Sequence, residues 1–368
     1  MAWIWQHRNW PQFIYHIEDF KEYELKFFEN AGMLYGSLQH VDENEQQALK
    51  VDLMSDEAYK TSEIEGELLN RDSIQSSIRR QLGLQVDHRR VEPAEQGIAE
   101  MMVDLYHNYD SPLDKKRLCL WHEMLTNGRR DLGDIGRYRT HDDPMQVVSG
   151  PIGRSVVHFE APPSKMVPEQ METYIVWFNN SNKGKTNHLP ALIRSAVAHL
   201  YFECIHPFED GNGRIGRAIS EKSLSQSLGK PTLIALSHAI LDQKKSYYEA
   251  LERNNRDLDI SDWIAYFCEM VMKAQLFTQQ SINFVIEKGK FYKRLGDQLN
   301  ERQAKVIERI FKEGVKGFDG GLSSKNYQAI SGAPSATATR DLARLVEIGA
   351  FIKTGELKGS RYYLNIKS

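Results

Sequence analysis

Apolar residues recur every three or four positions over most of the chain, from Ile14 to about Ile286. This is the period of an amphipathic helix, and the pair Ile74 and Ile78 is a clear example. The pattern predicts helices over 168–179, 190–204 and 215–228, with further helices up to residue 280. The expected fold class is therefore mainly α.

Two short segments interrupt the helical pattern. Gln146–Ser149 and Val156–Phe159 read as strands, and Gly150-Pro151-Ile152-Gly153 between them supplies the residue types of a turn. The pattern therefore predicts a small β-hairpin inserted in a helical domain.

The last part of the chain has a different pattern, with shorter helices followed by two strands. Helices are expected over 302–312, 323–331 and 335–348, followed by strands at 351–353 and 361–364 on either side of Gly355–Gly359. Three helices and a two-stranded wing are typical of a winged helix. We predict a helical N-terminal region at 1–92, a helical core at 93–288 and a winged-helix domain at 289–368.

Composition narrows the class of protein. Hydrophobic residues make up 41% and charged residues 26%, with no apolar run of the length, about 18 residues, that crosses a bilayer. The start of the chain lacks a basic stretch followed by an apolar one, so no secretory signal is expected. Three widely spaced cysteines indicate neither disulfides nor a zinc cluster. We expect a cytoplasmic protein that does not contact membranes.

Charge adds a further restriction. The formal net charge of -3 argues against binding of nucleic acid by the whole surface, although a basic patch on one domain would be hidden in that sum.

The segment with the clearest chemistry is 206–217, HPFEDGNGRIGR, between two strongly periodic helices. Pro207 is expected to end the first helix. Gly211 and Gly213 allow backbone conformations in which successive N–H groups converge on an anion. The next helix is expected to begin at or just before Arg214, so that its N-terminal amides face the same point. The segment therefore predicts a phosphate site.

The charged side chains of this segment suit a polyphosphate. Arg214 and Arg217 are three residues apart on one helix, so both guanidinium groups can hold phosphate oxygens. Asp210 offers a hard carboxylate oxygen to a magnesium ion. A neutral His206 can take the proton from a hydroxyl nucleophile. Together these groups predict a triphosphate held beside a general base.

Segment 206–217 resembles the signature of the Fic family, HPFxDGNGRxxR, at every fixed residue. The resemblance extends over about residues 95–285 and implies an all-helical Fic catalytic core in which the hairpin is a flap. It implies that His206 is the general base and that Phe208 anchors the loop. It also implies that Asp210 binds magnesium. The same resemblance implies an anion cradle formed by Gly211, Asn212 and Gly213, and it implies that Arg214 and Arg217 hold the β- and γ-phosphates.

A second pattern lies upstream. Thr61-Ser62-Glu63-Ile64-Glu65-Gly66 resembles the inhibitory helix motif of one Fic class, Ser or Thr, three residues, then Glu-Gly. In this interpretation Glu65 pairs bidentately with Arg217, so that the arginine cannot hold the γ-phosphate and ATP binds with its α-phosphate out of line. The resemblance therefore implies an autoinhibited enzyme.

The leading hypothesis is a magnesium-dependent protein adenylyltransferase that moves AMP from ATP to a Ser, Thr or Tyr hydroxyl of a target protein. The hairpin could pair with an extended stretch of that target. Removal of AMP from a modified protein, with Glu65 orienting a water, is an alternative on the same site. We also expect a homodimer.

A rival from another class is a DNA-binding regulator whose core only senses nucleotide. The third helix of the C-terminal unit would enter a major groove while cations of the wing contact phosphates. The residues expected to do so are Thr337, Thr339, Arg340 and Arg344 on the helix, and Lys353, Lys358 and Arg361 on the wing. The intact His206 favours the enzyme, because a nucleotide sensor needs no base.

Overall fold

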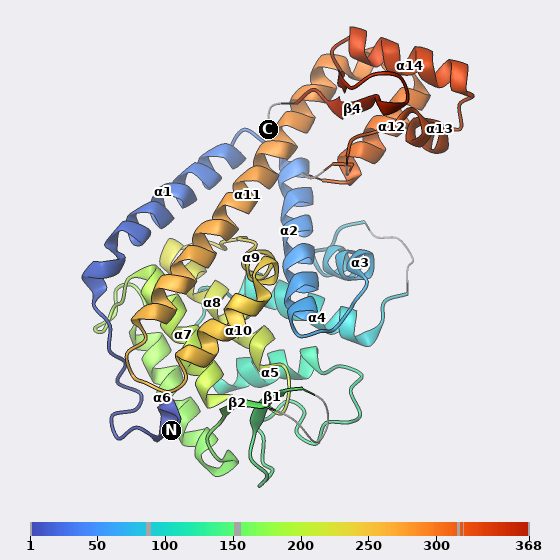
Figure 1. Cartoon of the computed structure of the whole chain (residues 1–368). Coiled ribbons are helices and arrows are strands. Elements are labelled where there is room, and N and C mark those ends of the chain that lie inside the picture. Colours follow the sequence, from blue (N-terminus) through green and yellow to red (C-terminus); the bar gives the residue numbers. More distant parts are fainter. Residues whose placement is uncertain (1, 86–89, 151–155, 315–316, 319, 367–368) are drawn as a thin grey trace. The chain divides into compact units, whose positions relative to one another are not determined.

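The computed structural model describes residues 2–85, 90–150, 156–314, 317–318 and 320–366. Figure 1 shows its helices and its two small antiparallel sheets. The helices are α1 (Lys21–Leu38), α2 (Glu43–Ile64), α3 (Arg71–Gln81), α4 (Pro93–His107), α5 (Lys115–Leu125), α6 (Val167–Asn180), α7 (Ala191–Ile205), α8 (Asn212–Leu228), α9 (Leu236–Asp242), α10 (Lys244–Arg253), α11 (Ser261–Leu295), α12 (Glu301–Lys312), α13 (Ser324–Ser331) and α14 (Ser335–Glu347). The strands are β1 (Gln146–Ser149), β2 (Val156–Glu160), β3 (Phe351–Thr354) and β4 (Arg361–Leu364). The predicted mainly α class with a small hairpin is confirmed.

The chain divides into two compact units. Unit 1 comprises Met1–Gly32 and Lys50–Phe277, and unit 2 comprises Met33–Leu49 and Thr278–Ser368. The three-domain division drawn from the sequence stays a prediction. No helix of the described chain is long and apolar enough to span a membrane.

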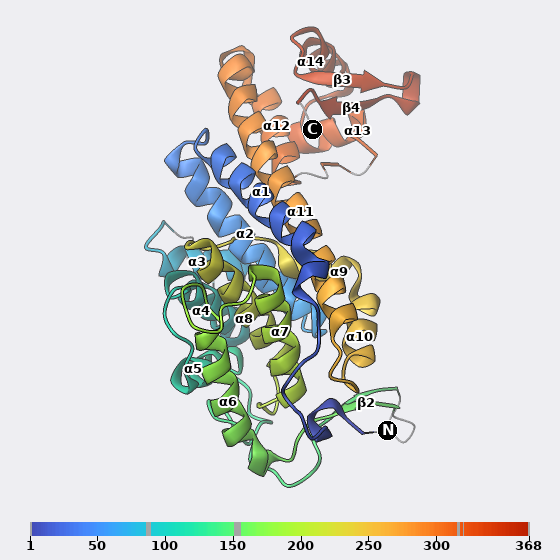
Figure 2. The same ribbon diagram turned by 90° about the vertical axis from the view of Figure 1, so that its left-hand side faces the viewer.

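Helices α7 and α8 lie side by side in unit 1, in both views of the molecule (Figures 1 and 2). Every residue of α7 except Glu203 is buried, as expected for a helix that is apolar on nearly all sides. Because α7 ends at Ile205 and α8 begins at Asn212, the segment between them is held at the ends of two buried helices. This is the loop in which the sequence places the phosphate site.

The predicted hairpin is present as β1 and β2. The two strands are antiparallel, with Gln146 opposite Glu160 and an irregularity between Val147 and Val148. The predicted turn residues Pro151, Ile152 and Gly153 lie outside the described part of the chain.

Side chains from elsewhere in unit 1 cap the outer edge of β2. The indole Nε1 of Trp5 donates to the carbonyl of Glu160 at 2.7 Å, and the amide of Asn255 donates to that of His158 at 3.0 Å. Because these carbonyls already have partners, β1 is the strand of the hairpin with the more accessible edge.

Unit 2 contains α12, α13 and α14 followed by the antiparallel pair β3 and β4, in the order that the sequence predicts. Its core includes Val306, Tyr327 and Leu342. Asp341 of α14 is also buried, and it accepts hydrogen bonds from Arg302 and from the hydroxyl of Tyr327, each at 3.0 Å. This pairing ties α14 to the two helices before it.

Candidate functional site

The site begins where α7 ends. His206 follows the last helical residue and adopts the left-handed conformation with φ 49°, which turns the chain out of the helix before Pro207. Its ring nitrogen Nδ1 lies 3.3 Å from the carbonyl oxygen of Glu203, one helical turn earlier. Nδ1 is therefore occupied by the backbone, and the other ring nitrogen, Nε2, is the one available for proton transfer.

Arg139 holds the backbone of His206 in place. Its Nε donates to the carbonyl of His206 at 2.8 Å, and its other nitrogens donate to Ser164 and to the carbonyl of Pro162. Burial, together with the charge of Arg139, lowers the pKa of His206 to about 4. The imidazole is therefore neutral at neutral pH, as a general base must be. No pattern in the sequence indicated this role of Arg139.

The loop is anchored by Phe208 and Asn212. The side-chain oxygen of Asn212 accepts from the backbone N–H of Phe208 at 2.9 Å, and its amide donates to the carbonyl of Phe208 at 2.8 Å. The ring of Phe208 is fully buried and stacks on His122, with 4.3 Å between ring centroids. The side chain of Asn212 therefore closes the loop, while its backbone N–H remains for an anion, and its part in an anion cradle stays a prediction.

The two glycines of the loop have different roles. Gly211 has φ 81° and precedes α8, so it needs the conformational freedom that the sequence suggested. Gly213 lies inside α8 and is not in the left-handed region, contrary to the expectation of a flexible cradle residue. A Cβ at Gly213 would overlap the carboxylate of Glu65. Gly213 is therefore needed for close approach rather than for backbone freedom.

Arg217 is held by the end of α2. The arginine is buried, with 1% of its side chain exposed. Its Nε donates to the hydroxyl of Thr61 and one terminal nitrogen to the carbonyl of Thr61, at 2.7 and 2.9 Å. The same nitrogen donates to Glu65 at 2.7 Å. These contacts explain why a hydroxyl residue and a glutamate stand four positions apart in the upstream motif.

The ion pair between Glu65 and Arg217 is not the bidentate pair that was expected. One carboxylate oxygen of Glu65 meets one nitrogen of Arg217, and the other oxygen lies 3.5 Å from the hydroxyl of Tyr248. The second terminal nitrogen of Arg217 is buried without a hydrogen-bond partner in the described chain. Burial works against the charge, but Glu65 raises the pKa of Arg217. The arginine is therefore a cation with an unused donor, which an anion can satisfy.

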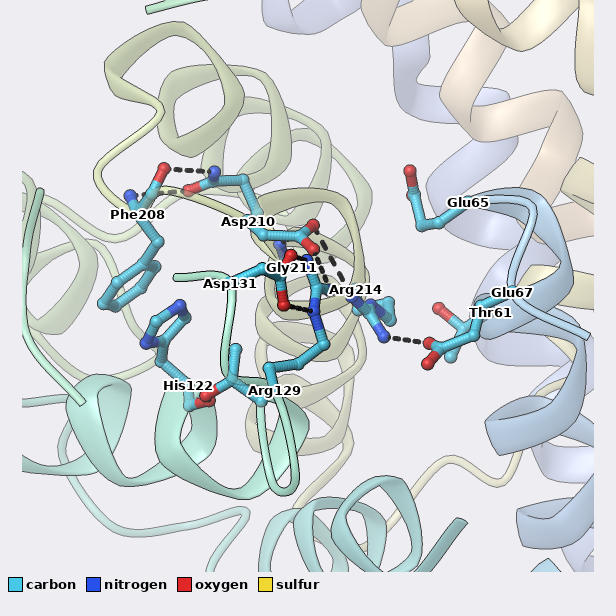
Figure 3. Close-up of polar contacts among 12 residues, drawn as sticks. Thr61, Glu65, Glu67, His122, Arg129, Asp131, Phe208, Asp210, Gly211 and Arg214 are labelled. Atoms are coloured by element: carbon cyan, nitrogen blue, oxygen red, sulfur yellow. Dashed lines mark hydrogen bonds and ion pairs between the residues drawn. The ribbon is translucent and has the colours of Figure 1, made fainter. Parts of the chain in front are cut away.

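Glu67 forms a second contact of the same kind, which sequence analysis missed. Its carboxylate pairs with Arg214, of which 5% of the side chain is exposed, while Nε of Arg214 is buried without a partner in the described chain. Figure 3 shows Thr61, Glu65 and Glu67 on the segment that faces Arg214 and Asp210. Glu65 and Glu67, two residues apart, thus contact Arg217 and Arg214, the two arginines at the start of α8.

Asp210 lies at the mouth of the loop with 37% of its side chain exposed. Arg129 donates to one carboxylate oxygen at 2.6 Å, and the backbone N–H of Gly211 donates to the other at 2.6 Å (Figure 3). Burial alone would raise its pKa, but Arg214 and Arg129 lower it, so Asp210 is ionised at neutral pH. Arg129 was not found from the sequence, because it precedes Asp210 by 81 residues.

The donor set at Asp210 fits magnesium. The described residues contain no cluster of three or more metal-binding side chains. A single carboxylate is nevertheless a common protein contribution to a magnesium ion, which takes its remaining ligands from phosphate oxygens and water. Magnesium at Asp210 would therefore depend on a bound polyphosphate.

Comparison with known families gives two matches. Residues 112–224 match the Fic/DOC family, and residues 3–84 match a domain of unknown function, DUF4172. The first match contains His206, the loop and both arginines. The second contains the motif around Glu65.

Curated relatives match parts of the chain. A probable protein adenylyltransferase of Aquifex aeolicus is 41% identical over 61 residues, which are 17% of this chain and 18% of that protein. Protein adenylyltransferase fic-1 of Caenorhabditis elegans is 27% identical over 139 residues, 38% of this chain and 23% of that protein. The matched part thus spans less than a quarter of either relative.

Solved structures resemble the fold over a greater length. A Fic family protein from Desulfovibrio desulfuricans has a TM-score of 0.53 at 21% identity, covering 96% of this chain and 98% of that one. Fic-1 of C. elegans has a TM-score of 0.51 at 19% identity, covering 71% of each chain. Residues 112–224 are thus identified as a Fic/DOC domain by the family match, and the solved structures share its fold.

Proposed function

We propose that the protein is a protein adenylyltransferase, which transfers AMP from ATP to a hydroxyl of a target protein and which Glu65 inhibits. The observation that carries this proposal is the arrangement of loop 206–217: two buried arginines with unused donors at the start of α8, beside a neutral histidine. Relatives named as protein adenylyltransferases support it.

The reaction follows from these positions. The acceptor oxygen attacks the α-phosphorus, a new P–O bond forms, and the bond to pyrophosphate breaks. His206 takes the acceptor proton at Nε2, because Nδ1 faces the carbonyl of Glu203. The N-terminal amides of α8 and the guanidinium groups of Arg214 and Arg217 hold the β- and γ-phosphates. Asp210 would hold magnesium, which neutralises charge on the phosphates.

Inhibition is a competition for cations. Glu65 takes a donor of Arg217 and lies over Gly213, where a Cβ would not fit. Glu67 takes a donor of Arg214. A triphosphate that is to be held by both arginines competes with both carboxylates for them, so a nucleotide bound while both carboxylates stay in place is out of line for attack. The end of α2 therefore acts as a brake.

Target recognition is proposed to use the edge of β1. An extended segment of the target can add to this edge as a third strand, since β2 is capped by Trp5 and Asn255. Backbone pairing positions a hydroxyl without selecting much sequence. Ser, Thr and Tyr are therefore all proposed acceptors.

Incubation with α-labelled ATP and magnesium tests the activity, with label on protein as the readout. Asp210→Asn is expected to lower labelling on the order of 10²-fold and to raise the magnesium concentration required, because the metal loses its one charged protein ligand. Asp131→Asn is the matched control. Asp131 also pairs with Arg129, at 2.6 Å, but lies outside the metal site.

Two results would count against this function. Labelling that persists in excess chelator would remove magnesium from the mechanism, and equal effects of Asp210→Asn and Asp131→Asn would reduce Asp210 to a partner of Arg129. If the enzyme removed AMP label from a modified protein and added none to an unmodified one, the alternative function of AMP removal would be identified.

A second activity, binding of duplex DNA by residues 289–368, is favoured by the charge of this segment. Residues 289–368 hold 15 Lys and Arg against eight Asp and Glu, whereas the whole chain has a net charge of -3. The exposed face of α14 carries small residues around Arg340, namely Ala336, Thr339 and Ala343, and no carboxylate before Glu347. Such a face can approach a major groove closely.

The other cations proposed for this surface differ in how exposed they are and in whether they are already paired. Lys353 of β3 is exposed. Arg344 is exposed and pairs with Glu347 at 2.9 Å, so part of its charge is already compensated. The side chain of Lys358 lies outside the described residues. Arg340 is therefore the residue whose replacement is most informative.

Fluorescence anisotropy of the full chain with a labelled duplex at low salt tests this surface. Arg340→Glu is expected to weaken binding about tenfold, since it reverses charge at the centre of the proposed contact. Lys305→Glu, the same charge change on the exposed surface of α12, is the control and is expected to have a smaller effect. Equal effects of both changes, or no binding by the wild-type protein, would contradict a specific role of α14.

The homodimer and the cytoplasmic location stay predictions. Mass determination in solution is the direct check of the first.

A further inference from the structure

The carboxyl group of Glu203 lies between the base and the brake, and the mechanism above gives it no role. Glu203 is in the last turn of α7, with 12% of its side chain exposed. One oxygen, Oε2, is 3.7 Å from Nδ1 of His206. The other, Oε1, is buried without a hydrogen-bond partner in the described chain. A buried polar atom without a partner costs free energy, which indicates that the position is kept for another reason.

Helix α8 leaves space for this carboxyl group. A Cβ at Gly216 would be 2.5 Å from Oε1 of Glu203. Gly216 directly precedes Arg217, the arginine that is proposed to hold the γ-phosphate. The side chain of Glu203 therefore lies against the backbone of α8 between the general base and a phosphate-binding cation.

The charge of Glu203 decides what it does to a bound triphosphate. Burial, and then the nearby carboxylate of Glu65, raise its pKa to about 8, whereas Arg217 lowers it. At neutral pH it therefore carries a proton. The titratable and charged groups that face it come from the end of α2 and from α6, α7, α8 and α10. They are Glu65, Tyr174, Cys204, His206, Arg217, Tyr247 and Tyr248.

We propose, on the basis of this geometry and of the function proposed above, that Glu203 is a positioning residue that must keep its proton for a triphosphate to bind to Arg217. As a neutral acid it fills the space beside the ring of His206 and leaves Arg217 to the phosphate. As a carboxylate it would compete for Arg217 and repel the triphosphate, as Glu65 does.

The affinity for a non-hydrolysable ATP analogue, measured from about pH 7 to pH 9 in the Glu65→Gly background, tests this role. Removal of Glu65 takes away a charge that raises the pKa of Glu203, so ionisation is expected at or below about pH 8. The Glu65→Gly protein, which is the parent of the variants below, is expected to lose about tenfold in affinity for the analogue across this range. A group with a pKa near 8 is about one-tenth protonated at pH 9.

Glu203→Gln keeps the shape of the neutral acid and cannot ionise, so its affinity is expected to stay constant over the same range. Glu172→Gln, which removes an exposed carboxylate of α6, is expected to follow the parent. In transfer assays Glu203→Ala is expected to lower kcat, because the ring of His206 loses its support, and Glu203→Gln is expected to restore it.

A parent whose affinity does not change with pH would overturn the proposal without any variant at position 203. The same pH dependence in Glu203→Gln and the parent would also overturn it. Absence of nucleotide binding at every pH in every variant has a different meaning, because that result contradicts the proposed function itself.

Discussion

The Glu65→Gly protein is expected to transfer AMP on the order of 10²-fold faster than the wild-type protein. In the wild type, Glu65 takes a donor of Arg217 at 2.7 Å and lies where a Cβ on Gly213 would overlap it. Glycine removes the carboxylate and opens this space, so the γ-phosphate can reach Arg217 and bring the α-phosphate into line. Modification of the enzyme itself is expected to rise in parallel, and label incorporation from α-labelled ATP measures both.

Glu63→Gly is the matched control for this change. Glu63 is two residues away and pairs with Lys60 at 3.0 Å, so its loss removes a carboxylate and adds a glycine without freeing Arg217. Replacement of Glu67 together with Glu65 is expected to raise nucleotide affinity further, because Arg214 is then free as well. Equal rates for the wild type, Glu63→Gly and Glu65→Gly over a range of ATP concentrations would remove the brake from the mechanism.

His206→Ala is expected to lower AMP transfer by about 10²- to 10⁴-fold in the Glu65→Gly background, the range that a general base contributes. Nucleotide binding is expected to stay within about twofold, since the ring takes a proton and does not hold the phosphates. His188→Ala, a change at an exposed histidine, is the control. Transfer rates and analogue affinity measured on the same preparations separate the two effects.

The pH dependence of transfer provides an independent check of His206. Its pKa is lowered to about 4 by burial and by Arg139, so the ring is neutral and able to accept a proton above that value. Activity is therefore expected to fall only as the pH drops towards 4, and not near 6.5, the ordinary value for histidine. A loss of activity centred near pH 6.5, or a fully active His206→Ala protein, would exclude His206 as the base.

The helices and the loop could be predicted from the sequence because the patterns that indicate them are local. Apolar period placed α6 and α7 within one residue of their observed ends, and the glycine and proline residues marked where α7 stops. The observed start of α8, at Asn212, is two residues before Arg214, where the sequence analysis placed it approximately. The same local patterns predicted the hairpin and the order of elements in unit 2.

Contacts between distant segments were not predictable in this way. Arg129 reaches Asp210 over 81 residues, and Arg139 reaches the carbonyl of His206 over 67. Neither side chain belongs to a spacing pattern. The pairing of Glu67 with Arg214 had one available signal, its place two residues after Glu65. That signal has meaning only once the end of α2 is known to face α8.

The side-chain roles of two residues in this segment did not follow from their residue types. The amide of Asn212 bonds the backbone of Phe208, because the turn between α7 and α8 leaves both backbone groups of Phe208 to be satisfied. Gly213 was interpreted as a source of backbone freedom. Its position in α8 shows that the absent side chain is what matters there.

A crystal structure of the Glu65→Gly protein with magnesium and a non-hydrolysable ATP analogue is the most direct measurement. We expect the β- and γ-phosphates at the N-terminal amides of α8, with guanidinium groups of Arg214 and Arg217 on their oxygens and Nε2 of His206 facing the α-phosphate. A triphosphate bound elsewhere, with loop 206–217 empty, would contradict the proposed enzyme.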